Sequence, residues 1–165
     1  MKMKKFFFGI LILLFLFYFS LAEQILRINN FSLSYPSYYV RVDLYNIYQT
    51  TVLLDSRNQN RSIYVEFLQN VNINDFIKQT LKDLDDLYEK KYKVLVNEEK
   101  NYNGKRLFVL DYTFINLDQE YRSVKYFLES QGGYLGVYCM GPSKEFDEVY
   151  SDFLKIFDSI RSDSK

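Results

Sequence analysis

The stretch from Lys93 to Met140 consists of runs rich in apolar, β-branched and aromatic side chains, separated by short polar segments. Runs of this kind, bounded by turn residues, are typical of β-strands. Three short turn sequences interrupt the stretch, at Asn103-Gly104, Asp118–Glu120 and Gln131–Tyr134. Asn-Gly favours a type I′ hairpin turn, because both central residues of that turn need a positive φ. We therefore predict a meander of four consecutive antiparallel strands.

The lengths of the turns predict which residues face one another. A two-residue loop at Gly132-Gly133 would place Leu128 opposite Val137, and a three-residue loop at Asp118–Glu120 would place Leu110 opposite Leu128. Side chains then divide between a core face and a mixed face. The predicted core face comprises Phe108, Leu110, Tyr112, Phe114, Val124, Tyr126, Leu128, Leu135, Val137 and Cys139. The mixed face comprises Leu107, Val109, Asp111, Thr113, Lys125, Phe127, Tyr134 and Tyr138. Because the second face is half apolar, we expect both faces to be at least partly covered.

Two segments beside the meander repeat apolar residues at intervals of three and four, which predicts amphipathic helices. The first spans Asn74–Lys91, and Asn72 or Asn74 can cap it by accepting a hydrogen bond from a free amide. The second spans Ser143–Arg161, with Ser143 as its expected cap.

The N-terminal half predicts shorter strands at residues 31–35, 49–54 and 62–68, the last two forming a hairpin around a polar turn. Tyr38–Leu44 fits either an extended segment or a helical turn. The predicted fold class is therefore α+β, with an antiparallel sheet of about six strands flanked by two main helices.

The N-terminus has the features of a secretory signal peptide. Lys2, Lys4 and Lys5 precede the apolar run Phe6–Phe19, and Ser20-Leu21-Ala22 supplies small residues for cleavage. We predict a leader at residues 1–22 and one globular domain at residues 23–165. The alternative is an uncleaved signal anchor, which would attach the protein to the membrane.

Charge and cysteine content narrow the classes of partner. Without the leader, 18 basic residues face 21 acidic ones, so the domain is mildly acidic. Mild acidity argues against nucleic acid or an anionic membrane surface as the main partner. The single cysteine, Cys139, excludes an internal disulfide. Its place on the predicted core face indicates a buried thiol, with redox use as the lesser alternative.

The sequence offers little catalytic chemistry. It contains no histidine, which excludes Ser-His-Asp and Cys-His arrangements, and we expect no metal site and no cofactor. The carboxylates between Asp83 and Glu89 are interpreted as a solvated helix face. Asp111 lies in a strongly apolar strand, where a cross-strand ion pair with Lys125 is expected and a functional acid is the alternative.

The order of these elements resembles that of the PsbP-like α/β proteins, a superfamily named for the extrinsic photosystem II subunit that includes the bacterial DcrB-like envelope proteins. The matching pieces are Phe31–Pro36, Ser62–Val65, the helix at Asn74–Lys91, Asn103-Gly104-Lys105 and Phe157–Ile160. The resemblance implies an antiparallel sheet sandwiched by helices, without a catalytic centre, in proteins that bind other proteins and assist the assembly of larger complexes. Tyr38 and Tyr39 stand where the family often has a tryptophan. The metal-linked histidines of the photosystem subunit are missing, so no photosynthetic role is carried over.

We therefore expect an exported, periplasmic or extracellular, non-enzymatic protein that binds a protein partner in the cell envelope. The alternative is a small-ligand or lipid-binding domain that uses the mixed face of the sheet. Exposed aromatic residues favour partner binding because they bury a large area at low entropy cost. Core packing and codon bias are the competing explanation for the 16 tyrosines. The expected binding surface comprises Tyr38, Tyr39, Val109, Phe127, Tyr134 and Tyr138.

Overall fold

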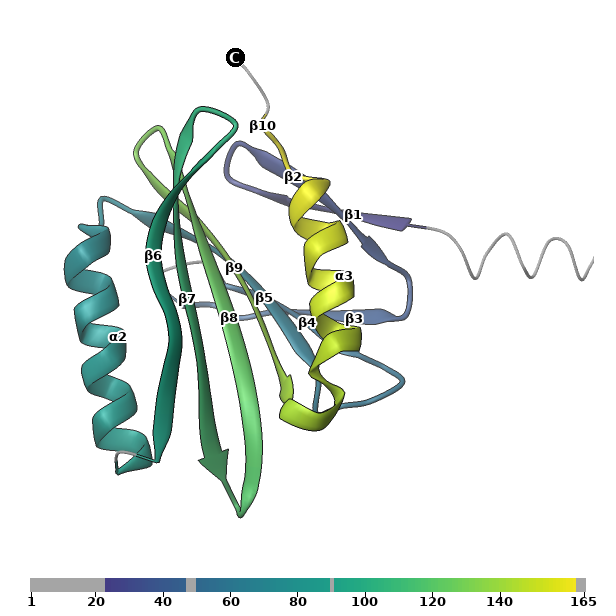
Figure 1. Cartoon of the computed structure of the whole chain (residues 1–165). Coiled ribbons are helices and arrows are strands. Elements are labelled where there is room, and N and C mark those ends of the chain that lie inside the picture. The colour runs from purple at the N-terminus through teal and green to yellow at the C-terminus, as the bar shows by residue number, and fades with distance from the viewer. Residues whose placement is uncertain (1–22, 47–49, 90, 163–165) are drawn as a thin grey trace, which may run out of the picture.

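The computed structural model describes residues 23–46, 50–89 and 91–162, which form two antiparallel sheets, two α-helices and a short 3-10 turn (Figure 1). The predicted α+β class is confirmed. The leader predicted at residues 1–22 lies outside the described residues. Among those that are described, no helix is long and apolar enough to cross a membrane.

The main sheet has seven strands in the order β3-β4-β5-β9-β8-β7-β6. Its last four strands along the chain are the predicted meander. Of the segment Tyr38–Leu44, residues Tyr39–Asp43 form an extended strand of this sheet. The strands are β3 (Tyr39–Asp43), β4 (Thr51–Asp55), β5 (Ser62–Gln69), β6 (Tyr92–Tyr102), β7 (Lys105–Asn116), β8 (Gln119–Ser130) and β9 (Gly133–Pro142).

A second, smaller sheet has three strands in the order β1-β2-β10. Its strands are β1 (Glu23–Ile28), β2 (Phe31–Pro36) and β10 (Arg161–Ser162). β10 pairs with β2 directly after the last helix, so this sheet joins the two ends of the described chain. β2 was predicted from its alternating pattern, whereas β1 and β10 were not predicted.

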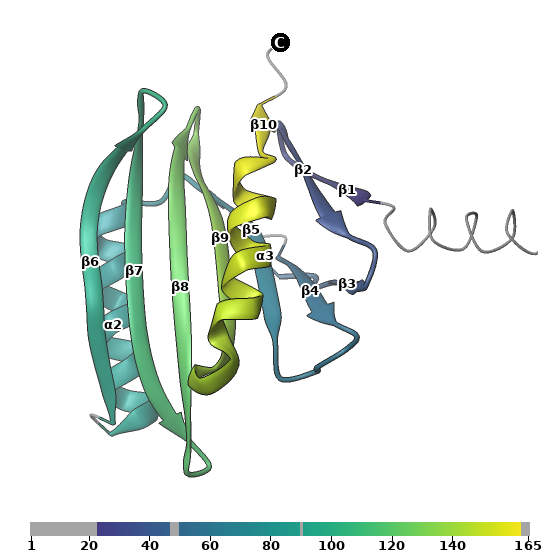
Figure 2. The same cartoon turned by 45° about the vertical axis from the view of Figure 1, so that its right-hand side comes forward.

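The two helices cover opposite faces of the main sheet (Figure 2). α2 (Ile73–Tyr88) lies behind β6–β8, and Asn72 caps it by accepting from the amide of Asn74 at 3.1 Å. α3 (Phe146–Asp158) lies in front of β9 and β5. The expected cap at Ser143 is wrong, because a 3-10 turn, η1 (Ser143–Glu145), precedes the helix and neither Pro142 nor Glu145 forms a side-chain cap.

The β8–β9 turn is displaced by one residue from its predicted place. The loop is Gln131-Gly132, with Ser130 opposite Gly133, so Leu128 faces Leu135 instead of Val137. Gly132 takes the positive φ of 83° that the turn requires. A register error of two residues leaves every side chain on its predicted face. Val124, Tyr126, Leu128, Leu135, Val137 and Cys139 therefore do share one face.

The predicted β7–β8 register is wrong by three residues. The loop is Leu117-Asp118, and both residues have positive φ, 49° and 61°, as a type I′ turn demands. Leu110 consequently faces Lys125 instead of Leu128. An odd shift moves side chains to the opposite face, so the β7 part of the predicted core face lies on the other side of the sheet. Those residues are Phe108, Leu110, Tyr112 and Phe114.

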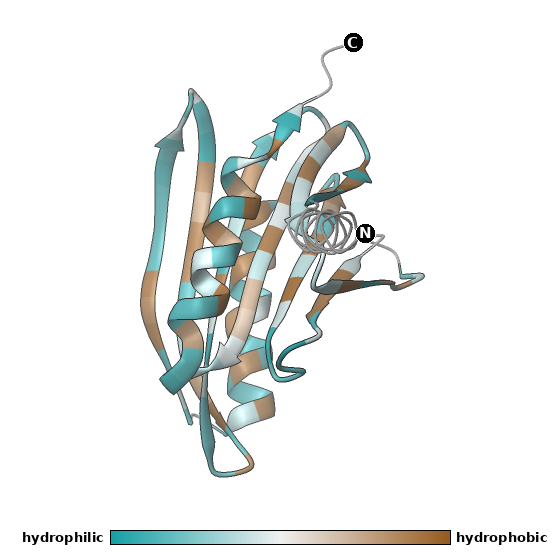
Figure 3. Ribbon diagram, turned by 90° about the vertical axis from the view of Figure 1, so that its right-hand side faces the viewer, coloured by the Kyte–Doolittle hydropathy of each residue, from teal (hydrophilic) through white to brown (hydrophobic). Residues whose placement is uncertain are grey.

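Both faces of the main sheet are buried, which confirms that each is covered. On the α3 side, Val109, Val137 and Phe153 belong to a large core that also includes residues of the small sheet. On the α2 side, Phe108, Phe127 and Leu110 belong to two smaller clusters. Figure 3 shows apolar residues, coloured brown, along the strands between these layers.

Replacing Leu117 tests the corrected β7–β8 turn. A leucine at positive φ is strained by about 1 kcal/mol, and its side chain is fully exposed, so little packing would be lost. Leu117→Asn should raise the free energy of unfolding by about 0.5–1 kcal/mol in urea titrations, because Asn tolerates this conformation. Exposed Ile115, which has no positive φ, provides the control: Ile115→Asn should bring no such gain. A Leu117→Asn variant no more stable than the parent would contradict the two-residue turn.

Candidate functional site

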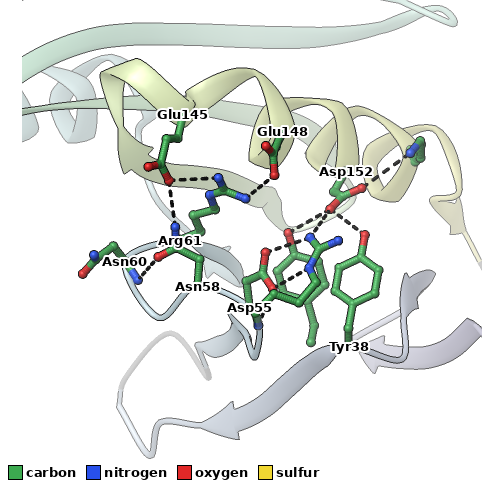
Figure 4. A network of polar contacts seen from close by, with 11 residues as sticks. Tyr38, Asp55, Asn58, Asn60, Arg61, Glu145, Glu148 and Asp152 are labelled. Carbon is green, nitrogen blue, oxygen red and sulfur yellow. Dashed lines mark hydrogen bonds and ion pairs between the residues drawn. The ribbon is translucent and has the colours of Figure 1, made fainter. Parts of the chain in front are cut away.

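The densest polar network in the described part of the chain joins the β4–β5 hairpin, the start of β3 and α3 (Figure 4). The hairpin loop places Arg57 two residues after Asp55. Asp55 is fully buried and accepts three hydrogen bonds from Arg57, one from its backbone amide at 2.9 Å and two from its guanidinium at 2.9 and 2.8 Å. This local turn fixes both the backbone and the side chain of Arg57.

The guanidinium of Arg57 lies over an aromatic ring. Its central carbon is 3.6 Å from the centroid of the Tyr38 ring, within the range of a cation–π contact. The Arg57 side chain remains 48% exposed. It therefore presents a cation to solvent in a single, supported orientation.

Asp152 connects these two residues to α3. Its carboxylate accepts from the Tyr38 hydroxyl at 2.6 Å and from Arg57 at 3.4 Å. Tyr39 donates to the same oxygen at 3.4 Å, and Lys155 approaches the other oxygen at 3.5 Å. Despite its charge, Asp152 is only 6% exposed. Its contacts tie α3 to residues more than 90 positions earlier in the chain.

A second arginine extends the network along α3. The Arg61 side chain is buried and pairs with Glu145 at 2.9 Å and with Glu148. Asn58 donates to Glu145 at 2.8 Å. An open depression of about 360 Å³ adjoins this network, and it is lined by Arg57, Asp147, Glu148, Ser151 and Asp152. Another open depression, of about 410 Å³, lies between α2 and β6–β7, away from the network. The network thus borders a shallow, accessible hollow.

The ionisation of these groups is fixed at neutral pH. Burial opposes the charged form of Asp55, but the hydrogen bonds from Arg57 hold its pKa below its ordinary value. Asp55 in turn raises the pKa of Arg57. Burial and the hydrogen bond to Asp152 raise the pKa of Tyr38. At neutral pH the cluster therefore contains a charged Asp55, a charged Arg57 and a neutral Tyr38.

The six residues expected to form a binding surface do not lie together on one exposed face. Tyr38 and Tyr39 belong to the network just described, where Tyr39 is buried. Val109 is buried on the α3 side of the main sheet, and Phe127 is buried on the α2 side. Tyr134 and Tyr138 pack with Phe127 on the α2 side. Since Val109 and Phe127 lie on opposite faces, these side chains do not share a ligand cavity either.

The corrected register also changes the partner of Asp111. Its carboxylate accepts two hydrogen bonds from Arg122, at 3.0 and 2.7 Å, instead of pairing with Lys125. Lys125 lies on the opposite face, 5.0 Å from the centroid of the Tyr138 ring. Asp111 therefore forms a cross-strand ion pair, as expected, but its partner is Arg122, and the predicted partner, Lys125, is wrong.

Cys139 is fully buried on the face that includes Val137, which confirms the predicted buried thiol. Burial raises the pKa of this thiol, which suppresses the reactive thiolate. Among the residues that the structure describes, no three carboxylate or thiol side chains lie close enough to hold a metal ion.

β5 contains a buried carboxylate that was not predicted from the sequence. Glu66 is 5% exposed and accepts from the Thr50 hydroxyl at 3.0 Å and from Tyr138. Gly136 lies directly opposite, and a Cβ there would come within 3.2 Å of the Glu66 side chain. Burial raises the pKa of Glu66 above its ordinary value. The available signal was a glutamate between Val65 and Phe67 within an apolar strand.

Comparisons with known proteins identify the fold. No protein-family model matches the sequence, and no curated protein matches it. The solution structure of cyanobacterial PsbP (CyanoP) from Synechocystis is similar, with a TM-score of 0.68 and 14% identity over 86% of this chain and 92% of that one. LpqN of Mycobacterium tuberculosis, described as involved in cell envelope biogenesis, gives a TM-score of 0.59 and 10% identity over 84% and 89% of the two chains. The chain has a PsbP-like fold, as the resemblance implied.

The buried Glu66 predicts a dependence of stability on pH. Because its pKa is higher in the folded protein than in the unfolded chain, the folded state favours the protonated form. Its contribution to the free energy of unfolding is therefore greatest at acidic pH and falls as the pH rises through the folded pKa. Glu66→Gln, which stays neutral, should unfold at a higher urea concentration than the parent at pH 8, and the difference should shrink towards pH 4.

Exposed Glu120 supplies the control for this pH series. Glu120→Gln should leave the urea midpoint close to that of the parent at both pH values. A Glu66→Gln variant that is less stable than the parent at pH 8 would show that the ionised carboxylate stabilises the fold.

Proposed function

We propose that this chain is an exported, non-enzymatic accessory protein that binds a protein partner in the cell envelope through the surface around Arg57 and Tyr38. The signal-peptide pattern at the N-terminus supports export. The similarity in fold to LpqN, a protein involved in cell envelope biogenesis, supports the cellular setting.

One observation carries the proposal: Arg57 is half-exposed yet held in place on three sides. Asp55 accepts hydrogen bonds from its guanidinium, and the Tyr38 ring packs against the guanidinium. The carboxylate of Asp152 lies 3.4 Å from the same group. Arginine and tyrosine dominate the binding energy of many protein interfaces. A side chain that is already ordered loses little entropy on binding, so more of the contact energy appears as affinity.

The hollow beside Arg57 adds chemical selectivity. Its rim combines the Arg57 cation with the carboxylates of Asp147 and Glu148 and the exposed Ser151. A partner surface that offers both an acidic and a basic side chain would complement this pattern. The depression is shallow and open, which suits a protein surface better than an enclosed small molecule.

Site-specific photocrosslinking in the producing cells tests this surface. A photoreactive amino acid at Ser151 should give one reproducible adduct with an envelope protein, identified by mass spectrometry, whereas the same probe at exposed Lys93 should not. Arg57→Ala should reduce the adduct by about tenfold or more, since truncation of a central interface arginine typically costs at least 2 kcal/mol.

Arg106 provides a matched control for Arg57. It is similarly exposed, pairs with Glu99 through two hydrogen bonds and lies over the Phe108 ring. Arg106→Ala should leave the adduct intact. Because Arg57→Ala leaves Asp55 buried without its partner, Arg57→Lys keeps a cation there and should also weaken the adduct while preserving the fold. Equal adduct yields from the folded Arg57 variants and from Arg106→Ala would refute the proposed surface.

A further inference from the structure

Strand β3 lies at one end of the main sheet, with β4 as its only ladder partner among the described strands (Figure 1). Its backbone orientation follows from two hydrogen bonds. Leu44 N–H donates to the Thr50 carbonyl at 2.8 Å, and Ser56 N–H donates to the Tyr38 carbonyl at 3.0 Å. Since the orientation alternates along a strand, the backbone groups of Val40 and Val42 face β4, and those of Arg41 and Asp43 face away from the sheet.

The two edges of the sheet differ in how they are protected. The opposite edge, β6, carries a bulge between Val94 and Val96 and exposes Lys93 and Lys100, features that hinder pairing with another strand. β3 has a continuous register with β4 and contains no lysine or proline. It therefore keeps a regular edge, on which Arg41 and Asp43 are the charged residues.

The side chains of β3 are also open to a partner. Val40 and Val42, on the face opposite that of Tyr39, are 53% and 37% exposed. Arg41 and Asp43 form an exposed ion pair at 2.8 Å on the other face. An open depression of about 580 Å³ adjoins this pair, and its lining includes Arg27 and Asn29 at the end of β1. Space remains there for the side chains of an added strand.

The sequence of β3 is complementary to itself in one antiparallel register. If Val42 faces Val42 of a second copy, Arg41 of each chain lies directly opposite Asp43 of the other. Both residues have outward backbone groups, so the two Arg41–Asp43 pairs exchange about four backbone hydrogen bonds. Opposite charges then face each other across the strands, which stabilises this pairing. The neighbouring registers, centred on Arg41 or Asp43, place like charges opposite each other and are disfavoured.

We propose that β3 pairs with β3 of a second copy of this chain, which joins the two main sheets into one continuous sheet across a two-fold axis at Val42. The occupant is a second copy because the Arg41–Asp43 pattern complements itself. This proposal is independent of the function proposed above, since it uses the edge of β3 and does not involve the hollow beside Arg57.

Cysteine crosslinking of the full-length chain tests the register. Residues opposite each other in a non-hydrogen-bonded antiparallel pair have Cα atoms about 4.5 Å apart, which permits a disulfide. Val42→Cys should therefore give a covalent dimer when cells are treated with diamide. Val40→Cys lies on the same face and is at least as exposed, but two such residues would be four positions out of register and should give little dimer. The native Cys139 is buried and should not contribute.

Charge reversal in the Val42→Cys background tests whether the strand that pairs with β3 belongs to a second copy of this chain. Arg41→Asp alone and Asp43→Arg alone should each reduce the dimer about tenfold, because like charges then face each other. Co-expression of the two variants with different tags should restore a mixed dimer, since each chain complements the other. Their folds should be preserved because both side chains are exposed, which circular dichroism checks.

Three outcomes would overturn the proposal: equal crosslinking of Val40→Cys and Val42→Cys, a lack of any homodimer, or failure of the two charge variants to restore the dimer when mixed. A disulfide from Val42→Cys to a different protein would also overturn it, and would assign the edge to an unrelated partner strand.

Discussion

The alternation of side chains along β7–β9 is the constraint on which the rest of the structure depends. Helices cover both faces of this sheet, so each residue of the central strands must suit one of two cores. Val109 packs towards α3 and Phe108 towards α2. A change of one residue in the length of a turn would exchange these sets and bury Asp111 or Lys125 in the wrong layer.

Because both sheet faces are buried in cores, the proposed binding surface lies at the periphery of the sheet. The β4–β5 hairpin, the start of β3 and α3 meet at Asp152, which receives hydrogen bonds from Tyr38 and Arg57. Burial makes each of these polar contacts stronger than it would be in water. Because the buried carboxylates of Asp55 and Asp152 have hydrogen-bond partners, the free-energy cost of burying them stays low. The same contacts that hold α3 against the hairpin also order Arg57 at the surface, so the stability of the fold and the proposed binding surface depend on one network.

The sequence sufficed to predict the meander, both main helices and the buried state of Cys139, because periodicity and Asn-Gly turns report on local structure. Asn103-Gly104 forms its turn as expected, with both φ angles positive. Leu117-Asp118 adopts the same conformation without the residue types that announce it, which explains the error in the β7–β8 register. The contact of Tyr38 with Asp152 joins residues 114 positions apart, and nothing in the local pattern indicates it. Tyr38, which was named as part of a candidate surface, lies in the polar network, whereas Val109 and Phe127 could not be distinguished from surface residues until the register was known.

Cross-strand nuclear Overhauser effects test the central claim, the arrangement of the two buried faces, most directly. In the two-residue turn, Val109 and Tyr126 form a non-hydrogen-bonded pair, whose α-protons approach closely. We predict strong contacts between these two α-protons, and likewise between those of Asp111 and Val124. Contacts that instead place Leu110 opposite Leu128, or Tyr112 opposite Tyr126, would show that the β7 side chains face the other way, and would contradict the account of both cores.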